Sequence, residues 1–272
     1  MTNLLDTPLF SLNAIEETVN ILKKSQTNIQ ISGVSDNGLA HIISVLGDSF
    51  KNKVIVTFSE QKAMELYDSL RLFVPDIVYF PPKDFIFYNA DISGKTMVTN
   101  RIKTIEAILT GSATIVTTGS SLMDKLIPME EISNNILTID MTSIIEPAAI
   151  SSKLTALGFE RSDQVESHGQ FSIRGSIIDI FPLTSEVPYR IDLFDDEVDS
   201  IKTFDVDSQR TIENVESVTI FPASEYILSP KQISAGMERI KKELAAYAKK
   251  LRATFKTEEA HRIETLTNDF LE

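Results

Sequence analysis

Two patterns of apolar residues follow one another along this chain, and together they restrict the folds that it can adopt. Up to about residue 135, short β-branched runs alternate with stretches whose apolar residues recur at helical spacing. Strands are expected at 28–32, 53–58, 77–80 and 113–118, and helices at 39–46, 61–73 and 98–109. Alternation of this kind is typical of an α/β fold in which helices cover a mainly parallel sheet.

Two local signals refine this first part. The run at 53–58 is continuous and rich in β-branched residues, which is typical of a strand buried on both faces. Ser59 follows this run in the position of a helix N-cap, and Pro75 should stop the helix that Ser59 starts.

The pattern changes after residue 135. Residues 171–220 read as strand after strand with acidic or proline-bearing turns, which predicts an inserted α+β module with antiparallel pairing. A long polar helix is expected from 231 to about 253. These changes divide the chain into a first domain at 1–135, an inserted domain at 136–220 and the start of a third part at 221–272. Because the last residues look helical and lack a cap, we expect the sequence to be the N-terminal piece of a longer protein.

Charge and composition limit the possible partners. The chain has 26 Lys and Arg against 39 Asp and Glu, a net charge of −13. Surfaces that hold a phosphate backbone carry clustered positive charge, so we expect little direct nucleic-acid binding and a basic or mixed protein surface as partner. With no cysteine and three scattered histidines, we expect no metal site and no disulfide. No signal peptide and no apolar stretch near the ~20 residues that span a bilayer is present, so we expect a cytoplasmic protein without membrane contact.

One segment has the context of a phosphate-binding loop. Residues 33–40 follow a predicted strand and open a predicted helix, and Gly33 and Gly38 have the spacing of the motif G-x-x-x-x-G-K-[ST]. However, Leu39 stands where the motif has its phosphate-binding lysine, and Ala40 where it has the hydroxyl that binds Mg²⁺. We therefore expect this degenerate phosphate loop to bind no nucleotide; a simple strand–helix turn with glycines is the alternative interpretation.

A second segment carries an intact G-K-T. It lies at 93–96, but Asn89 occupies the position of the first glycine of the motif. The preceding residues 85–90 are aromatic and follow two prolines, which does not suit a phosphate loop. We expect no nucleotide site here.

The inserted module contains a hairpin with an informative alternation. Residues 189–204 form two strands that turn at 195–197. If Ile191 and Leu193 face the core, then Arg190 and Phe194 face outward, since side chains of a strand alternate. The same reasoning at an earlier strand, with Phe171 inward, turns Arg174 outward. Arginine and aromatic side chains are enriched at the energetic centres of protein interfaces.

Other interpretations of this region stay open. Phe194 could pack under a loop, and the two arginines could pair with Asp192 or Asp195. The acidic residues near the turn could be proposed as a metal or catalytic site, but no base, nucleophile or nucleotide loop lies near them in the sequence, so solvated turn residues are expected. His168 and Gly169 are expected to form the turn that leads into the strand at 171.

A dense set of motifs lies between residues 160 and 225. They are 163–166 (DQVE), 169–171 (GQF), 174–182 (RGSIIDIFP), 190–201 (RIDLFDDEVDSI), 204–205 (FD), 207–211 (DSQRT) and 221–223 (FPA). This pattern resembles the N-terminal UvrB-like region of the bacterial transcription-repair coupling factors (the Mfd family), and a weaker collinear resemblance covers 25–130. UvrB resembles this region too, but its phosphate loop is intact, so Leu39 and Ala40 favour the coupling factors.

The resemblance carries several expectations. It implies a degenerate helicase-like domain 1a of the P-loop NTPase type up to residue 135, an inserted domain 2 at 136–220 and the start of a truncated domain 1b. In this family domain 2 recruits UvrA, and the contacting residues of its motifs correspond to Arg174, Arg190 and Phe194. The motor, the RNA-polymerase-binding domain and DNA translocation belong to other parts of those proteins.

The expected function is therefore a non-catalytic module without cofactor that recruits UvrA to stalled RNA polymerase for nucleotide excision repair. Its parent would be an ATP-dependent DNA translocase. One alternative is a UvrB-type ATP-dependent damage-recognition helicase subunit, which requires nucleotide binding at 33–40. Another is a structural or autoinhibitory domain that packs on the rest of its own chain.

Overall fold

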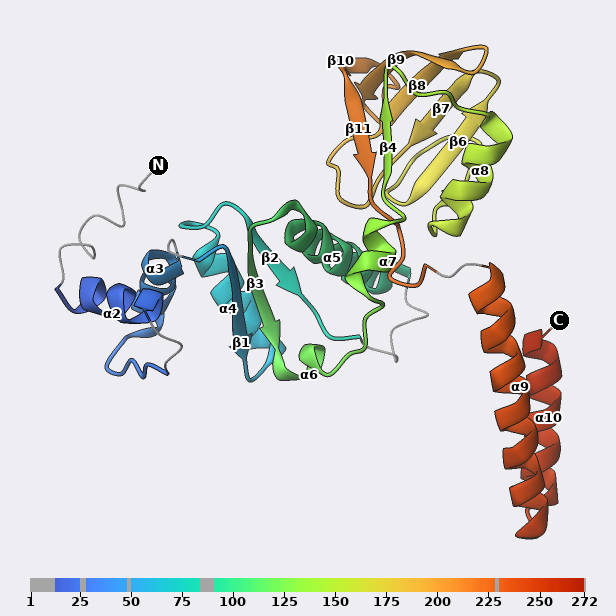
Figure 1. Ribbon diagram of the computed structural model, residues 1–272, viewed down its shortest axis with the longest axis horizontal. Helices are drawn as coiled ribbons and strands as arrows, with labels where there is room; N and C mark the ends of the chain where they lie inside the picture. The colour runs from blue at the N-terminus through green and yellow to red at the C-terminus, as the bar shows by residue number, and fades with distance from the viewer. Residues whose placement is uncertain (1–12, 25–27, 48–49, 84–90, 228–229, 272) are drawn as a thin grey trace. The chain divides into compact units, whose positions relative to one another are not determined.

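The computed structural model describes residues 13–24, 28–47, 50–83, 91–227 and 230–271 (Figure 1). The chain divides into two compact units, Met1–Glu225 and Tyr226–Glu272. It combines parallel and antiparallel sheets with helices, so the mixed α/β character predicted from the sequence is confirmed. Among the described residues, no helix is both long and apolar enough to cross a membrane.

The first unit contains a small parallel sheet with helices on it. Its three strands are β1 (Asn52–Thr57), β2 (Ile77–Phe80) and β3 (Ala113–Thr118), in the order β1-β3-β2. Helix α4 (Glu60–Leu70) follows β1, and helix α5 (Asp91–Thr110) follows β2. These elements confirm the alternation of strands and helices predicted between residues 53 and 118.

The central strand β3 is buried because α4 and α5 cover opposite faces of the sheet. Val116 packs with Leu66 and Leu70 of α4. Its neighbour Ile115 packs instead in a cluster with Ile108 of α5. Since consecutive side chains of a strand point to opposite faces, the two helices lie on the two sides of the sheet.

Helix α4 begins where the sequence predicts. The Ser59 hydroxyl accepts a hydrogen bond from the Lys62 backbone N–H at 3.2 Å, which is the N-cap interaction. The helix ends at Leu70, three residues before the predicted end. The backbone N–H groups of Phe73 and Val74 both donate to the Leu70 carbonyl, so the last turn is tightened ahead of Pro75.

The prediction that residues 53–58 form a strand buried on both faces is wrong. In the described sheet β1 lies at an edge and pairs only with β3. The side chains of Val54 and Val56 are 56% and 52% exposed. A β-branched run reports a preference for extended backbone, whereas burial depends on which elements cover the strand.

The strand predicted at 28–32 does not form. These residues lie exposed between α2 (Asn13–Lys24) and α3 (Asp36–Gly47), without regular structure. Ile29 and Ile31 are 37% and 48% exposed. A strand exists only where a neighbour accepts its backbone hydrogen bonds, and no described strand pairs with this segment. The helix predicted after it is present as α3.

The chain leads into the inserted module through two short helices, α6 (Gly119–Leu122) and α7 (Met129–Ser133). Strand β4 (Leu137–Asp140) then pairs antiparallel with β11 (Ser217–Ile220). The two ends of the module are thus joined by a two-stranded sheet.

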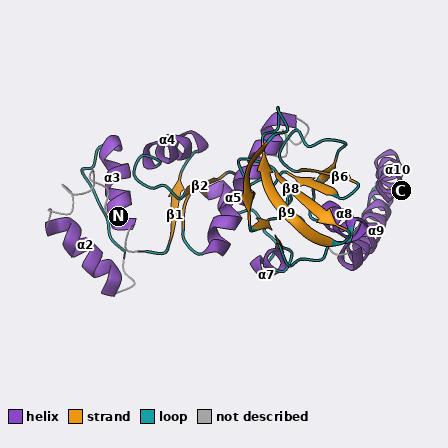
Figure 2. Ribbon diagram, turned by 90° about the horizontal axis from the view of Figure 1, so that it is seen from above, coloured by secondary structure: helices purple, strands orange, loops and turns teal. Residues whose placement is uncertain are grey.

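Between β4 and β11 lies a six-stranded sheet in the order β10-β9-β8-β7-β6-β5. Its pairs are antiparallel except β5 with β6, and Figure 2 shows β8 and β9 running side by side. The strands are β5 (Glu160–Arg161), β6 (Gln170–Arg174), β7 (Ile177–Ile180), β8 (Tyr189–Phe194), β9 (Glu197–Phe204) and β10 (Thr211–Val215). The antiparallel module predicted from the sequence is confirmed.

One face of this sheet forms the core of the module. Phe171, Ile178, Ile191 and Ile201 are at most 1% exposed and come from four neighbouring strands. Helix α8 (Pro147–Ala156) packs against β5 and β6.

The second unit is a helical hairpin of α9 (Pro230–Ala253) and α10 (Thr257–Leu271). Ala248 and Leu251 of α9 pack with Ala260 of α10 in its core. The long polar helix predicted from 231 to 253 is confirmed as α9. In the turn between the helices, Phe255 is 94% exposed and has a φ of 62°.

Candidate protein-binding site

The face of the six-stranded sheet opposite its core carries the residues that the sequence singles out. We call it the outer face and define it by Arg174, Asp179, Arg190, Asp192 and Phe194. Asp179 of β7 stands opposite Arg190 of β8 in the strand register. Ile191 and Leu193, which alternate with Arg190, Asp192 and Phe194, are 0% and 6% exposed. The predicted alternation along β8 is therefore confirmed.

A single carboxylate joins the two arginines of this face. Arg174 Nη2 donates to Asp179 Oδ2 at 2.6 Å. Arg190 donates to the same carboxylate through Nε at 2.7 Å and through Nη2 at 2.9 Å. Asp179 is only 1% exposed, so its charge is balanced by two guanidinium groups rather than by water.

Arg190 is held from several sides. Its Nη2 also donates to the Gln209 side-chain oxygen at 2.9 Å, and its guanidinium lies 4.3 Å from the centre of the Phe204 ring. Hydrogen bonding to Asp179 raises the pKa of Arg190, although partial burial acts in the opposite direction. With 18% of its side chain exposed, Arg190 is a fixed charge at the surface.

Arg174 and Phe194 are the more accessible members of the outer face. The Arg174 side chain is 42% exposed, so part of its guanidinium can still reach a partner. Phe194 is 74% exposed at the end of β8. Exposed phenylalanine and arginine side chains are residue types enriched at the energetic centres of protein interfaces.

The alternative arrangement considered for these residues is incorrect in its details. Phe194 does not pack under a loop. The arginines are ion-paired, but with Asp179 rather than with Asp192 or Asp195. Asp192 instead accepts hydrogen bonds from Lys202 Nζ at 2.6 Å and from Ser200 Oγ at 2.9 Å. Burial alone would raise the pKa of Asp192, but these hydrogen bonds and the nearby positive charges lower it overall.

Sequence reasoning missed three residues that organise the outer face. Alternation with Ile178 and Ile180 places Asp179 on the outward side together with Arg190, but it does not show that the two side chains touch. Gln209 and Phe204 gave no comparable signal. Gln209 reaches Arg190 from a loop in which its own φ is 58°, and loop geometry of this kind is not readable from alternation.

The acidic residues at the β8–β9 turn, Asp195, Asp196 and Glu197, are exposed. Among the residues that the structure describes, no cluster of His, Asp or Glu could hold a metal ion. Asp195 has a φ of 58°, a conformation that Asp tolerates in tight turns. His168 and Gly169 form the turn before β6, as predicted, and the His168 ring stacks on Phe181 with centroids 3.9 Å apart.

Residues 33–40, predicted to be a degenerate phosphate loop, lead into α3 and pack against the first sheet. Gly33 has a φ of 76°, and the Ser35 hydroxyl accepts a hydrogen bond from the Gly38 N–H at the start of α3. Leu39, at the position of the missing lysine, packs against the core that α4 shares with the sheet. Ala40 is 1% exposed in the same core. The side chains that would have to contact phosphate and Mg²⁺ are therefore apolar and turned toward the core.

The second candidate loop lies inside a helix. Residues 93–96 fall within α5, which begins at Asp91. The aromatic residues at 85–90 that entered this prediction lie outside the described residues.

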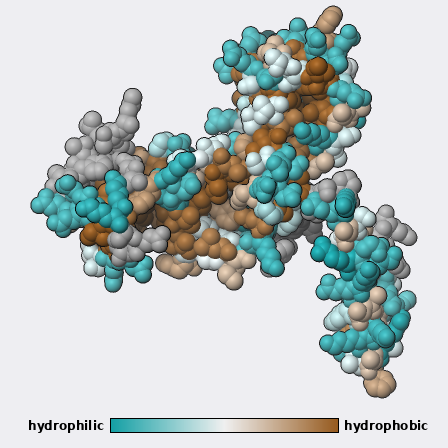
Figure 3. Space-filling view, viewed as in Figure 1, coloured by the Kyte–Doolittle hydropathy of each residue, from teal (hydrophilic) through white to brown (hydrophobic). Residues whose placement is uncertain are grey.

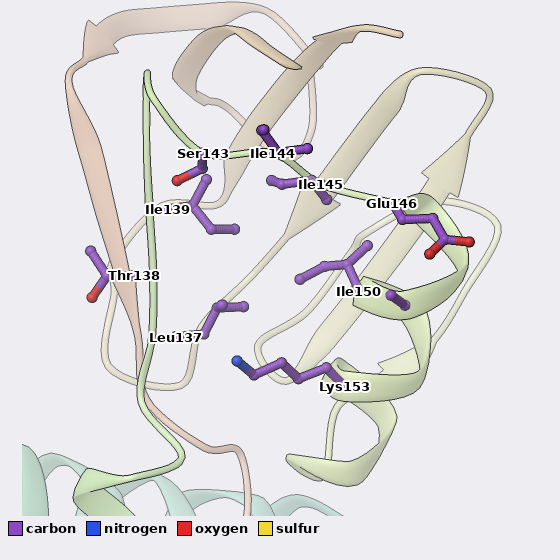
Figure 4. A pocket seen from close by; sticks show the side chains of 10 residues that line it. Leu137, Thr138, Ile139, Ser143, Ile144, Ile145, Glu146, Ile150 and Lys153 are labelled. Carbon is purple, nitrogen blue, oxygen red and sulfur yellow. The ribbon is translucent and has the colours of Figure 1, made fainter. Parts of the chain in front are cut away.

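A pocket of about 330 Å³ lies between β4 and α8 (Figure 4). Ile139, Ile145 and Ile150 point into it, and Glu146 and Lys153 stand at its margin. None of these residues belongs to the outer face. Besides the isoleucines, Thr138 and Ser143 and one residue of each charge line the pocket.

Comparison with known proteins places this module in a described family. Residues 137–226 match the family model described as UvrB interaction domain. The matched range begins at β4 and extends just beyond β11, so it contains the six-stranded sheet and its outer face.

The chain is also similar to curated proteins named transcription-repair-coupling factor. It is 34% identical to the one from Bacillus subtilis over 247 residues, which is 89% of this chain and 21% of that protein. It is 31% identical to the one from Escherichia coli over 64% of this chain and 15% of that protein. Identity to the Staphylococcus aureus protein is 32% over 79% of this chain and 19% of that protein. The chain thus spans about a fifth of the length of these relatives, or less.

Proposed function

Because this chain carries a UvrB interaction domain and is homologous to the bacterial transcription-repair coupling factors, we propose that it is the part of such a factor that recruits UvrA. In this proposal residues 1–135 are a helicase-like domain that has lost its nucleotide site. Residues 136–220 are the partner-binding domain, and 221–272 begin a third domain. The parent protein would act on DNA and on stalled RNA polymerase in the cytoplasm through other parts of its chain.

The observation that carries this proposal is the outer face. Arg174 and Phe194 are accessible there, and Arg174 donates to the Asp179 carboxylate that Arg190 also binds. A side chain whose orientation is fixed before binding loses less conformational entropy when the partner arrives. The resemblance assigns the contacts with UvrA to Arg174, Arg190 and Phe194.

The test is to measure UvrA binding by the chain and by a variant with Arg174→Ala, Arg190→Ala and Phe194→Ala. Residues at the centre of an interface each contribute about 1–2 kcal/mol or more, so the triple variant should lose at least about a hundredfold in affinity. Calorimetric titration with purified UvrA gives the dissociation constants. Circular dichroism checks that the variant remains folded.

A matched control variant comes from the same sheet. Arg161→Ala, Arg210→Ala and Ile212→Ala also remove two exposed arginines and one exposed apolar side chain. This control should bind UvrA with nearly the affinity of the unchanged chain. Equal affinities of a folded triple variant and the control would show that UvrA does not use the outer face.

The proposed module has no catalytic role because its phosphate loop lacks both functional side chains. Leu39 cannot neutralise phosphate charge, and Ala40 cannot bind Mg²⁺. Calorimetric titration with Mg-ATP should therefore give no binding heat up to millimolar nucleotide. A micromolar dissociation constant would contradict the adaptor role and favour a UvrB-type ATP-dependent subunit.

A further inference from the structure

The net charge of −13 conceals a strongly basic element. Helix α9 contains seven Lys and Arg residues and two Glu residues, a net charge of +5 over 24 residues. Figure 3 shows hydrophilic side chains over much of the α9–α10 hairpin. Nucleic-acid binding depends on where positive charge is clustered, so the average over the whole chain does not describe this helix.

Five of the seven positive charges of α9 lie on the side away from α10. Leu244, Ala248 and Leu251 mark the side that packs in the hairpin, since they are buried or half-buried at helical spacing. Five cations project from the opposite half of the helix at 100° per residue, and all five are exposed. We call them the basic stripe: Lys231, Arg239, Lys242, Lys249 and Lys250.

Little within the hairpin neutralises the basic stripe. The ion pairs recorded for the described part of the hairpin join Arg252 to Glu264 at 2.7 Å and Lys256 to Glu259 at 3.2 Å. Both pairs lie near the turn, and neither includes a residue of the stripe. The two carboxylates of α9 lie toward the edges of that half of the helix, so the stripe keeps a surplus of positive charge over roughly 28 Å of helix.

The side chains between the cations distinguish between possible partners. They include Ala235, Ala246 and Ala253, whereas the exposed large side chains of α9, Ile233, Ile240 and Tyr247, lie on another side of the helix. A protein interface normally needs a buried apolar or aromatic centre, and single-stranded nucleic acid needs aromatic side chains for base stacking. The backbone of a duplex needs neither, because lysine and arginine on a helix suffice to contact its phosphates.

We propose that the basic stripe of α9 binds the phosphate backbone of duplex DNA without sequence preference. The site is separate from the outer face and does not depend on UvrA recruitment. Small alanine side chains let the helix approach the duplex, and the five cations contact successive phosphates. Binding releases counterions, so the affinity falls steeply as salt is added.

The experiment uses the whole chain and a fluorescein-labelled 20-base-pair duplex of random sequence, followed by fluorescence anisotropy. With five contacts, the affinity should fall about 10²–10³-fold between 50 and 200 mM salt. The variant Arg239→Gln, Lys242→Gln, Lys249→Gln should bind more weakly at 50 mM. It should also show a salt slope smaller by about three, since each removed phosphate contact reduces the slope by about one.

The control removes the same charge elsewhere. Lys23→Gln, Lys24→Gln, Lys51→Gln changes three exposed lysines of the first unit and should leave DNA binding nearly unchanged. The proposal is overturned if the unchanged chain does not bind duplex at 50 mM salt. It is also overturned if the two variants bind equally, or if a 20-base single strand binds more tightly than the duplex.

Discussion

At the scale of single residues, a buried carboxylate, Asp179, joins the two arginines of the outer face. Asp179 is inaccessible and would be costly to bury unpaired, yet it accepts three hydrogen bonds from Arg174 and Arg190. Without the Asp179 carboxylate, the two positively charged guanidinium groups would repel one another. Asp179 therefore holds the two arginines of the outer face together.

Replacing Asp179 with asparagine should destabilise the chain. The neutral amide would leave two neighbouring guanidinium groups without a counter-charge, at a cost of about 2–3 kcal/mol in the free energy of unfolding. Urea unfolding followed by circular dichroism measures this loss. Asp196→Asn, at an exposed position of the β8–β9 turn, should change stability by no more than about 0.5 kcal/mol. Equal midpoints for the two variants would show that the carboxylate at 179 does not hold the arginines.

The same residues show how far the site could be predicted. Alternation along a strand was sufficient to place Arg174, Arg190 and Phe194 outward, because the period of two follows from backbone geometry. It could not identify the partner of the arginines, because Asp179 stands opposite Arg190 only once the register of β7 and β8 is known. The sequence pattern predicts to which face of the sheet a side chain points, whereas the strand register determines which side chains touch.

At the scale of elements, helix α8 is followed by a glycine that the fold requires. Gly158 follows the helix with a φ of 88°, and a Cβ placed on it would lie 2.7 Å from the Ser224 Cβ. The Ala223 N–H donates to the Leu157 carbonyl at 2.8 Å, so the returning chain lies directly against this turn. Both the backbone angle and the close approach exclude a side chain.

Gly158→Ala should therefore cost more than the backbone angle alone explains. A left-handed non-glycine residue costs about 1–2 kcal/mol, and the contact with Ser224 should add about 1 kcal/mol or more. Gly175→Ala provides the control, because Gly175 has a φ of 61° and nothing within 4 Å of the added Cβ. Chemical unfolding gives the free energy of unfolding of both variants, and the difference between their losses is the contribution of the contact with Ser224. Equal losses would mean that the chain near Ser224 moves away without cost.

The strand predictions were accurate where other elements pair with the strand and cover it, and they failed where the described structure has no such neighbour. Strands β2 and β3 form as predicted because helices cover them on both sides. The runs at 28–32 and 53–58 both contain β-branched residues, yet the first is not a strand and the second has exposed valines. Local sequence encodes a preference for extended backbone, whereas pairing and burial are properties of the assembled sheet.

At the scale of the whole molecule, a buried ionic cluster joins parts of the first unit that are far apart in sequence. Arg101 of α5 is 0% exposed and donates through Nε to Glu225, 124 residues later, at 2.5 Å. The same guanidinium donates to the Pro81 carbonyl and to Asp124. Lys83 adds a second cation beside Glu225 at 3.1 Å. The inserted module lies between Arg101 and Glu225 in the sequence, so this cluster joins the chain before the module to the chain after it.

The cluster predicts a strong dependence of stability on Arg101. Arg101→Met fills a similar volume but leaves Glu225 buried beside Lys83 alone, which should reduce the free energy of unfolding by about 3–5 kcal/mol. Adding Glu225→Gln should restore part of this loss, because the carboxylate that lost its main partner is then neutral. Arg252→Met breaks an exposed pair and should cost at most about 1 kcal/mol. Denaturant unfolding of the unchanged chain, Arg101→Met, Glu225→Gln, the double variant and Arg252→Met tests the coupling. If the two substitutions at 101 and 225 are simply additive, the long-range pair does not hold the first unit together.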